Sequence, residues 1–508
     1  MSLAEKPSRK RPRSSYWLTR FVFLRLLGLV YFFAFLVAAN QAIPLIGENG
    51  LTPAKAYLGR IGGSFSSDWE AFLALPTLFW WTLSDTSILM VAWTGVALSF
   101  LLLIGFANSI LMAILWFLYM SIVHIGQVWY GYGWEIQLLE TGFLAIFLCP
   151  LLDGRPFPRR PPPSPVIWLL RWLTFRIMLG AGLIKIRGDS CWRDLTCLVY
   201  HYETQPIPNP LSRYFHSMPL WFHKTGVLYN HLVELVAPFF VFGPRTARTI
   251  AGCLMVLFQL TLILSGNLSF LNWLTICPYI ACFDDRTLRR VFPRYLVYRA
   301  TLANRKSSVS KPQRVIVWLL VLLIGWLSIA PVMNLASPTQ VMNTSFNQWE
   351  LVNTYGAFGT VGRIRYEIIL EGTNDPNPSD NSEWKTYEFK AKPGDPMRQS
   401  PVVSPYHYRV DWQIWFAAMS TPSRHPWLIH LMWKLLQNDE SAVGLIAHNP
   451  FPDKPPKAIR AELYQYEFAP LDQPDGAIWN RKRVGTWFPQ FTLDNGQIKK
   501  FVESFSSR

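Results

Sequence analysis

The side chains best suited to chemistry gather in one polar segment between two long apolar runs. Lys185, His201, Glu203 and His216 supply amine, imidazole and carboxylate groups, which proteins use as general acids and bases. Clustered where the chain leaves an apolar run, they could serve a membrane-embedded enzyme acting on a protein or lipid substrate. The sequence carries no Gly-x-Ser-x-Gly elbow, His-Glu-x-x-His pair, phosphate loop or dinucleotide fingerprint. We therefore expect no catalytic residue and no cofactor, and keep the enzyme as the alternative.

Two cysteines in the same segment, Cys191 and Cys197, flank a Trp-Arg-Asp-Leu-Thr core. The topology predicted below places them on the oxidising side of a membrane, where a short disulfide-closed loop persists. We predict that disulfide, with two reduced core thiols as the alternative. A zinc site lacks further ligands at usable spacing, so no metal is expected. The remaining cysteines lie in apolar runs and are expected to be buried: Cys149, Cys253, Cys277 and Cys282.

The polar segment also carries aromatic and basic side chains of the kind that dominate protein interfaces. Three prolines between residues 206 and 210 restrict the chain and lower the entropy that binding would cost. We predict that four side chains contact a partner protein: Trp192, Arg193, Tyr200 and Tyr202. The alternative is that the segment packs as a lid on its own helices.

Ionisable side chains inside apolar runs are costly and need partners. Glu140 and Arg176 each lie within such a run, so we predict that they form an intramembrane ion pair. His231 and Glu234 share a helix face at i and i+3, which is half of a metal or acid–base site. The sequence offers no second such pair, and hydrogen bonding between helices is the expected role.

These residues must be positioned by membrane helices, because 51% of the 508 residues are hydrophobic and the apolar ones occur in runs. About 20 apolar residues cross a hydrocarbon core. We predict an α-helical polytopic membrane domain over residues 18–332, with an external loop at 187–225 and about nine spans, in any case an odd number. The expected spans are Leu18–Ala39, Ser87–Phe106, Asn108–Tyr130, Trp134–Pro150, Val166–Ile186, Gly226–Phe242, Arg248–Leu264, Leu268–Phe283 and Val315–Val332.

The net charge of +16 comes from basic residues concentrated beside the apolar runs. Such blocks orient membrane proteins with the basic side in the cytoplasm. We therefore expect residues 1–17, 155–160 and 286–314 to be cytoplasmic. Membrane lipid is the expected surrounding, and no nucleic-acid partner is expected.

Period-two alternation replaces continuous apolarity after the last run, which predicts a mostly β external domain of sandwich type over residues 333–508. Strands are expected at Val361–Leu370, Trp384–Lys390, Tyr408–Phe416 and Ile459–Phe468, and a helix at Trp427–Leu436. Asn343 begins a glycosylation sequon on the external side and is the expected site of a glycan. Asn267 also begins a sequon, but it lies between closely spaced spans.

Several segments resemble the lipase maturation factor family. They are GAGLIKIRGDSCWRDLTC from Gly180, HYETQPIPNP from His201, GNLSFLNWLT from Gly266, CFDD from Cys282, VNTYGAFG from Val352 and SPYHYRVDWQIWFAA from Ser404, together with Tyr16–Phe35. The resemblance implies a chaperone-like protein of the endoplasmic reticulum membrane, with a cytoplasmic N-terminus and a lumenal C-terminus. It implies secreted homodimeric lipases, such as lipoprotein lipase, as partners. A bacterial source would imply the inner membrane and would void the sequons.

Overall fold

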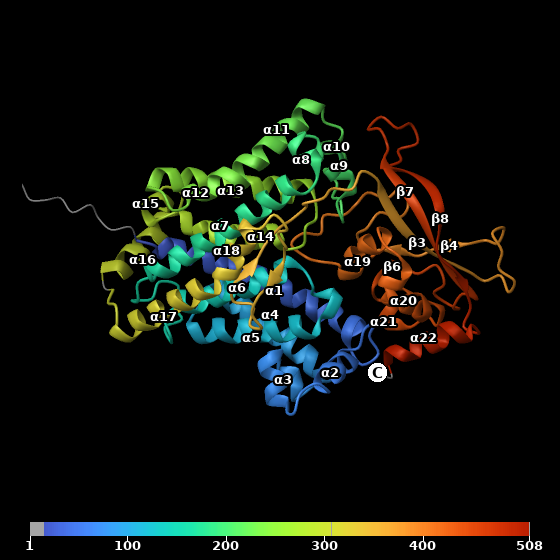
Figure 1. Ribbon diagram of the computed structural model, residues 1–508, viewed down its shortest axis with the longest axis horizontal. Coiled ribbons are helices and arrows are strands. Elements are labelled where there is room, and N and C mark those ends of the chain that lie inside the picture. Colours follow the sequence, from blue (N-terminus) through green and yellow to red (C-terminus); the bar gives the residue numbers. More distant parts are fainter. Residues whose placement is uncertain (1–14, 306, 507–508) are drawn as a thin grey trace, which may run out of the picture.

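Long apolar helices form one part of the molecule, and a β-sheet with its own helices forms the other (Figure 1). The structure is a computed structural model that describes residues 15–305 and 307–506. Residues 1–14, which make up most of the expected basic N-terminal segment, lie outside the described residues.

Five helices of the described chain are long and apolar enough to cross a membrane: α1 (Trp17–Ile46), α4 (Asp85–Ile104), α7 (Ser164–Arg187), α13 (Arg245–Ser265) and the combined α17 (Lys311–Leu327) and α18 (Ile329–Ala336). Shorter helices occupy the other expected spans: α5 (Ser109–Ile125), α6 (Gly133–Leu148), α11 (Leu220–His231), which continues through a π-helical turn (Leu232–Val236) into α12 (Ala237–Phe240), and α14 (Leu271–Tyr279). The prediction of a helical, multi-pass membrane domain is confirmed, with five candidate spans by length.

Side chains from elsewhere in the chain satisfy several helix ends. Asp285 accepts hydrogen bonds from the backbone N–H groups of Trp17 (3.0 Å) and Leu18 (2.8 Å), which have no partner within α1. Asn108 caps α5 locally, since its Oδ1 accepts from Leu111 N–H at 2.8 Å. The CFDD segment therefore fixes the start of the first helix.

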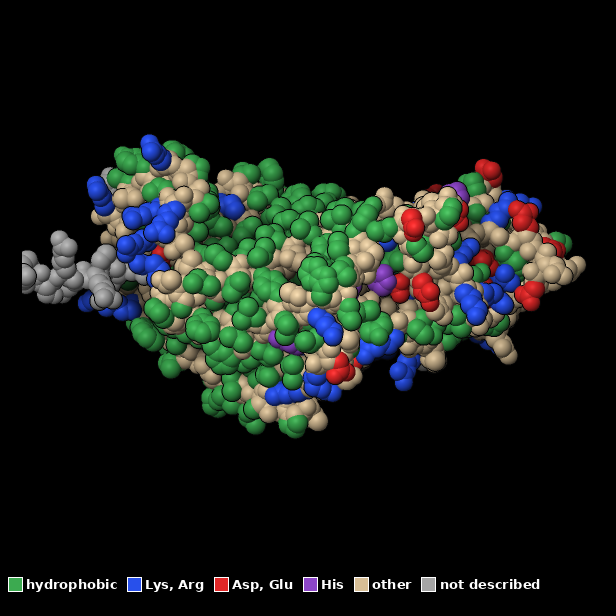
Figure 2. Space-filling view, turned by 90° about the horizontal axis from the view of Figure 1, so that it is seen from above, with side chains coloured by type: hydrophobic (Ala, Val, Ile, Leu, Met, Phe, Trp, Pro, Cys, Tyr) green, Lys and Arg blue, Asp and Glu red, His purple; other side chains and the backbone are tan. Residues whose placement is uncertain are grey.

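Short helices complete the membrane domain. They are α2 (Ala54–Gly62), α3 (Asp68–Ala74), α8 (Ser190–Arg193), α9 (Cys197–Thr204), α10 (Ser212–His216), α15 (Asp285–Leu288) and α16 (Arg294–Arg305). On the face seen in Figure 2, hydrophobic side chains cover the middle, between a basic end and a C-terminal end of mixed charge. This band is the surface expected for a protein embedded in lipid.

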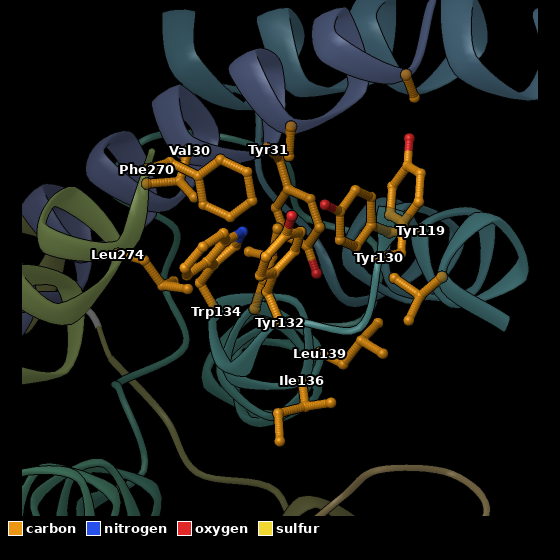
Figure 3. Close-up of a cluster of buried hydrophobic side chains, with 14 of the residues drawn as sticks. Val30, Tyr31, Tyr119, Tyr130, Tyr132, Trp134, Ile136, Leu139, Phe270 and Leu274 are labelled. Carbon is orange, nitrogen blue, oxygen red and sulfur yellow. The ribbon is translucent and has the colours of Figure 1, made fainter. Parts of the chain in front are cut away.

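Aromatic side chains join helices that are distant in sequence. Tyr31 of α1, Tyr119 of α5 and Trp134 of α6 point into one buried cluster with Phe270 (Figure 3). The rings of Tyr132 and Trp134 stack with centroids 4.4 Å apart. The cluster therefore ties the N-terminal half of the membrane domain to the segment before α14.

The C-terminal part contains a four-stranded antiparallel sheet in the order β4 (Lys385–Thr386), β3 (Arg365–Thr373), β7 (Ala458–Phe468), β8 (Trp479–Phe491). Two-stranded pairs add β1 (Thr344–Ser345) with β2 (Asn353–Thr354), and β5 (Glu388–Phe389) with β6 (Ile446–His448). The helices are α19 (Arg409–Ala418), α20 (Pro426–Leu436), α21 (Glu440–Val443) and α22 (Gly496–Ser506). The predicted sheet is present, but helices α19 and α20 pack against it where a sandwich would place a second sheet.

The strand expected at Tyr408–Phe416 is wrong, because these residues form α19. Its polar positions are buried as fully as its apolar ones. Arg409 pairs with Glu135 (Nη1 to Oε1, 2.9 Å), Asp411 accepts the backbone N–H of Ala391 (2.6 Å), and Gln413 donates to Val128 O (2.7 Å). The alternation of polar and apolar residues therefore did not mark a strand with one solvent-exposed face, because both the polar and the apolar side of α19 are buried.

The expectation for the remaining cysteines holds for three of four. Cys149, Cys277 and Cys282 are buried, whereas Cys253 is exposed on the outer surface of α13. An exposed cysteine on an apolar helix contacts the surroundings of the bundle, so burial between helices was the wrong expectation for Cys253.

Candidate functional site

The segment between α7 and α11 folds back onto the protein as three short helices. Asp189 begins α8 by accepting the Cys191 N–H at 3.0 Å, and it also accepts Arg363 Nη2 at 2.8 Å. Burial opposes ionisation of Asp189, but these donors outweigh it and lower its pKa. Cys191 and Cys197 form a disulfide with Cα atoms 4.7 Å apart, joining α8 to α9. The loop is thus closed on itself and tied to the C-terminal part.

The structure separates the four predicted client-binding residues into two groups. Trp192 and Tyr202 are only 2% and 5% exposed, and the indole Nε1 of Trp192 donates to Phe358 O at 2.9 Å. Arg193 is exposed and Tyr200 is half-buried. The prolines between residues 206 and 210 are likewise covered rather than displayed. Client binding by these residues stays a prediction, and in the structure the loop packs against its own protein with the Trp192 indole as a buried anchor.

Glu140 and Arg176 lie together in the membrane domain and form an ion pair. They are 1% and 2% exposed. The Tyr355 hydroxyl donates to Glu140 Oε2 at 2.7 Å, and Arg176 Nη1 donates to Asn353 O at 2.7 Å. The segment VNTYGAFG therefore enters the helix bundle and completes the hydrogen bonding of the pair.

Several further buried ion pairs were not predicted, and two of them join elements that are distant in sequence. Lys185 Nζ lies 2.5 Å from Glu234 Oε1, and Asn230 bridges the two side chains. Arg409 of α19 pairs with Glu135 of α6, and neither side chain is exposed. Glu135, Lys185 and Glu234 lie inside the expected spans, which was the available signal, whereas Arg409 lies outside them.

The potential acid–base groups do not form one cluster. Lys185 pairs with Glu234, whereas His216 Nε2 lies 3.6 Å from Glu203 Oε2. Glu203 also accepts the Phe468 N–H at 2.7 Å, and burial raises its pKa. Burial and the nearby charge of Lys185 lower the pKa of His201 to about 4. The four groups thus fall into two sets: Lys185 and His201 line one cavity, whereas Glu203 pairs with His216.

His231 and Glu234 share a helix face, but their side chains have different partners and do not form one site. His231 Nε2 contacts Trp192 O at 2.9 Å, while Glu234 turns to Lys185. No group of three or more His, Cys, Asp or Glu residues among those described could hold a metal ion.

The two sequons have different surroundings. Asn343 is exposed, and its Oδ1 accepts the Gly356 N–H at 3.3 Å. Asn267 is buried and donates to Pro208 O at 3.1 Å and Pro401 O at 2.8 Å. Asn267 therefore joins the lid to the C-terminal part, and its side chain is occupied.

Two cavities adjoin at this junction. The lateral cavity, of about 510 Å³, lies between α7, α9, α11, α13 and α14. The junction cavity, of about 360 Å³, lies between α6, α7, the 355–360 segment and α19. The two share lining residues: Ile177, Ala181, Leu268, Leu271, Ala357 and Phe358. Five segments that carry the family resemblance supply walls of these cavities, namely those from Gly180, His201, Gly266, Val352 and Ser404.

Comparison with known proteins agrees with this arrangement. The family described as Lipase maturation factor transmembrane domain matches residues 18–290, and the Lipase maturation factor C-terminal domain matches residues 351–489. The chain is 50% identical over 511 residues to Lipase maturation factor 1 of Bos taurus, covering 96% of this chain and 91% of the relative.

The chain is 49% identical over 503 residues to Lipase maturation factor 1 of Homo sapiens, covering 94% of this chain and 89% of the relative. It is 29% identical over 607 residues to Lipase maturation factor 2 of Homo sapiens, covering 96% and 84%. No solved structure matches significantly. Both family matches and the extent of the identity agree that this multi-pass membrane protein belongs to the lipase maturation factor family.

Proposed function

We propose that this chain assists the folding and assembly of secreted homodimeric lipases at the endoplasmic reticulum membrane. The observation that carries the proposal is its 50% identity, over almost the whole chain, to a protein named Lipase maturation factor 1. Lys185 and His201 line one cavity, whereas the Glu203–His216 pair does not line it. This separation supports a folding factor over an enzyme, since acid–base catalysis needs its groups within reach of one substrate.

The proposed topology has nine crossings, a cytoplasmic N-terminus and a lumenal C-terminal domain. Nine helical segments occupy the expected positions, and shorter ones such as α5 and α14 lie among long apolar neighbours. The domain limits we propose are residues 1–17, 18–332 and 333–508. Basic side chains at one end of the apolar band support the cytoplasmic assignment of that end (Figure 2).

The proposed client contact is the exposed rim of the disulfide-closed turn. Arg193 is exposed there, and Tyr200 stacks under the guanidinium of Arg363, with its ring centroid 4.5 Å from Arg363 Cζ. The side chains of Trp192 and Tyr202 are buried beneath this rim and fix its position. An unfinished lipase subunit exposes the apolar surface that dimerisation later covers, so a rim with an aromatic ring and basic groups could hold it. Asn343 is proposed to carry a glycan on the same lumenal side.

Complementation tests the function. Cells that lack their own family member are made to secrete lipoprotein lipase, with or without this chain, and lipase activity is measured per unit of secreted lipase. Restored activity per lipase is the expected result. Unrestored activity, with this chain present in the endoplasmic reticulum at the level of a working relative, would overturn the proposal.

The client contact is tested in the same cells with Arg193→Ala/Tyr200→Ala. We expect a loss of most lipase activity at unchanged abundance of the variant. Lys224→Ala, another exposed basic residue of the 187–225 loop, is the matched control. Equal lipase activity with the double variant and the control would remove the rim from the proposal while leaving the function itself standing.

A further inference from the structure

The lateral cavity is bounded by helices whose outer faces are apolar. Trp221 of α11 is 68% exposed, and the outer surface of α13 includes Leu257 and Leu264. Because α13 is long and apolar enough to span a membrane, lipid surrounds this wall. Ligands that enter between α11 and α13 therefore come from the bilayer.

The interior of the lateral cavity combines apolar walls with a few polar groups. Leu262, Phe258 and Met178 are among the side chains of its walls. Its volume of about 510 Å³ falls within the range of about 300–1,000 Å³ that is common for small-molecule sites. A mostly apolar cavity of this size fits an acyl chain or a fused-ring lipid.

An unpartnered acceptor faces this cavity. Asn272 is 1% exposed, and its Nδ2 donates to Gln259 Oε1 at 2.7 Å, whereas its Oδ1 accepts no hydrogen bond from the described residues. A buried acceptor left without a donor costs about 1–3 kcal/mol. His201 also lines the cavity and supplies imidazole nitrogens. The open acceptor of Asn272 calls for a ligand that donates a hydrogen bond.

The charged groups of the cavity are already neutralised. Lys185 and Glu234 pair at 2.5 Å, and Asn230 occupies one further hydrogen bond of each. A phosphate group would have to compete with Glu234 for Lys185, at a large cost in so buried a pair. The electrostatics therefore favour an uncharged head group.

We propose that the lateral cavity is a binding site for an uncharged, hydroxyl-bearing membrane lipid. Its hydroxyl donates to Asn272 Oδ1 or to His201, and its hydrocarbon part lies against the walls from α7, α11 and α13. Glycerides and sterols share this chemistry. The proposal does not depend on the client of the protein.

The test uses the full-length protein in membranes, with photoreactive, alkyne-tagged diacylglycerol and sterol probes applied in separate arms. Adducts are mapped by peptide mass spectrometry. We expect adducts on residues that line the lateral cavity, competed by the matching untagged lipid and not by phosphatidylserine. Adducts confined to outward residues such as Leu257 and Leu264, no adduct with either probe, or equal competition by phosphatidylserine would each overturn the proposal.

Two variants separate the cavity from its surroundings. Ala181→Phe places a ring in the shared wall of the lateral cavity and should reduce adduct yield about tenfold or more, while Leu257→Phe on the outer face should not. Asn272→Leu should weaken binding about tenfold, the usual size of one lost hydrogen bond. Wild-type labelling of Ala181→Phe in correctly folded protein would also contradict the site. The location of the wild-type adducts decides the question if either variant fails to fold.

Discussion

Removal of Glu140 should destabilise the protein far more than the loss of one carboxylate would suggest. Glu140 accepts from Arg176, from the Tyr355 hydroxyl at 2.7 Å and from the Asn353 N–H at 3.0 Å. In Glu140→Ala, Arg176 remains 2% exposed without its counter-charge. Breaking a buried ion pair from one side costs about 3–5 kcal/mol. We therefore expect the free energy of unfolding to fall by about 4 kcal/mol.

The double replacement Glu140→Leu/Arg176→Met should recover most of that loss, since it leaves no buried charge and roughly preserves volume. The assay is denaturant unfolding of purified protein in mixed micelles, with proteolytic release of the C-terminal part as a second readout, because Asn353 and Tyr355 connect the two parts. Exposed Glu48→Ala is the control. A Glu140→Ala variant within about 0.5 kcal/mol of wild type, or a double variant as unstable as the single one, would refute the reasoning.

The other predictions concern the lid. Trp192→Ala should cost about 3–5 kcal/mol, because the indole is buried and its hydrogen bond to Phe358 O is lost; thermal unfolding measures it. Replacing Cys191 and Cys197 with alanine should cost about 2 kcal/mol, from the entropy of a loop with a sequence separation of 6, and denaturant unfolding measures the loss. His201 should make stability depend on pH. Its folded pKa of about 4 lies below the unfolded value of about 6.5, so its contribution is intact above pH 6.5 and is lost as pH falls toward 4. Between pH 7 and pH 5 the loss is about 2 kcal/mol, and His201→Phe should remove that part of the pH dependence in unfolding curves.

Each of these expectations has an outcome that contradicts it. Full stability of Trp192→Ala would mean that the lid does not rest on its indole. The double cysteine variant should be as stable as reduced wild-type protein. If the variant is less stable than reduced wild type, the loss comes from side-chain packing and not from the entropy of the closed loop. An identical pH profile for His201→Phe and wild type would show that His201 titrates alike in folded and unfolded protein.

Apolar runs predicted the helices of the membrane domain well, because length and hydrophobicity are local properties. Glu140 and Arg176 could be matched, since both were unusual in apolar runs. The pair Lys185–Glu234 was missed because each residue was assigned to another group of polar side chains, and Glu135–Arg409 was missed because Arg409 lies outside the apolar runs.

The site was predictable only in outline. The composition of the 180–216 segment marks it as unusual, but it does not reveal whether Trp192 faces solvent or Phe358. A loop rich in aromatic residues and proline can expose its side chains to solvent or bury them against the rest of the protein. Which of the two occurs depends on the protein surface beside the loop. The helix α19 shows the same limit, since a segment buried on both faces loses the periodicity that separates helix from strand.

The central claim is that the lumenal rim of this lid touches a lipase before the lipase matures. A photo-crosslinking amino acid at position 193, in protein inserted in the endoplasmic reticulum, measures this directly while a homodimeric lipase is being made. The account predicts adducts with newly made lipase that disappear once active dimers form, and none from position 299, at the basic end on α16. No lipase adduct from position 193, or equal adducts from positions 193 and 299, would contradict it.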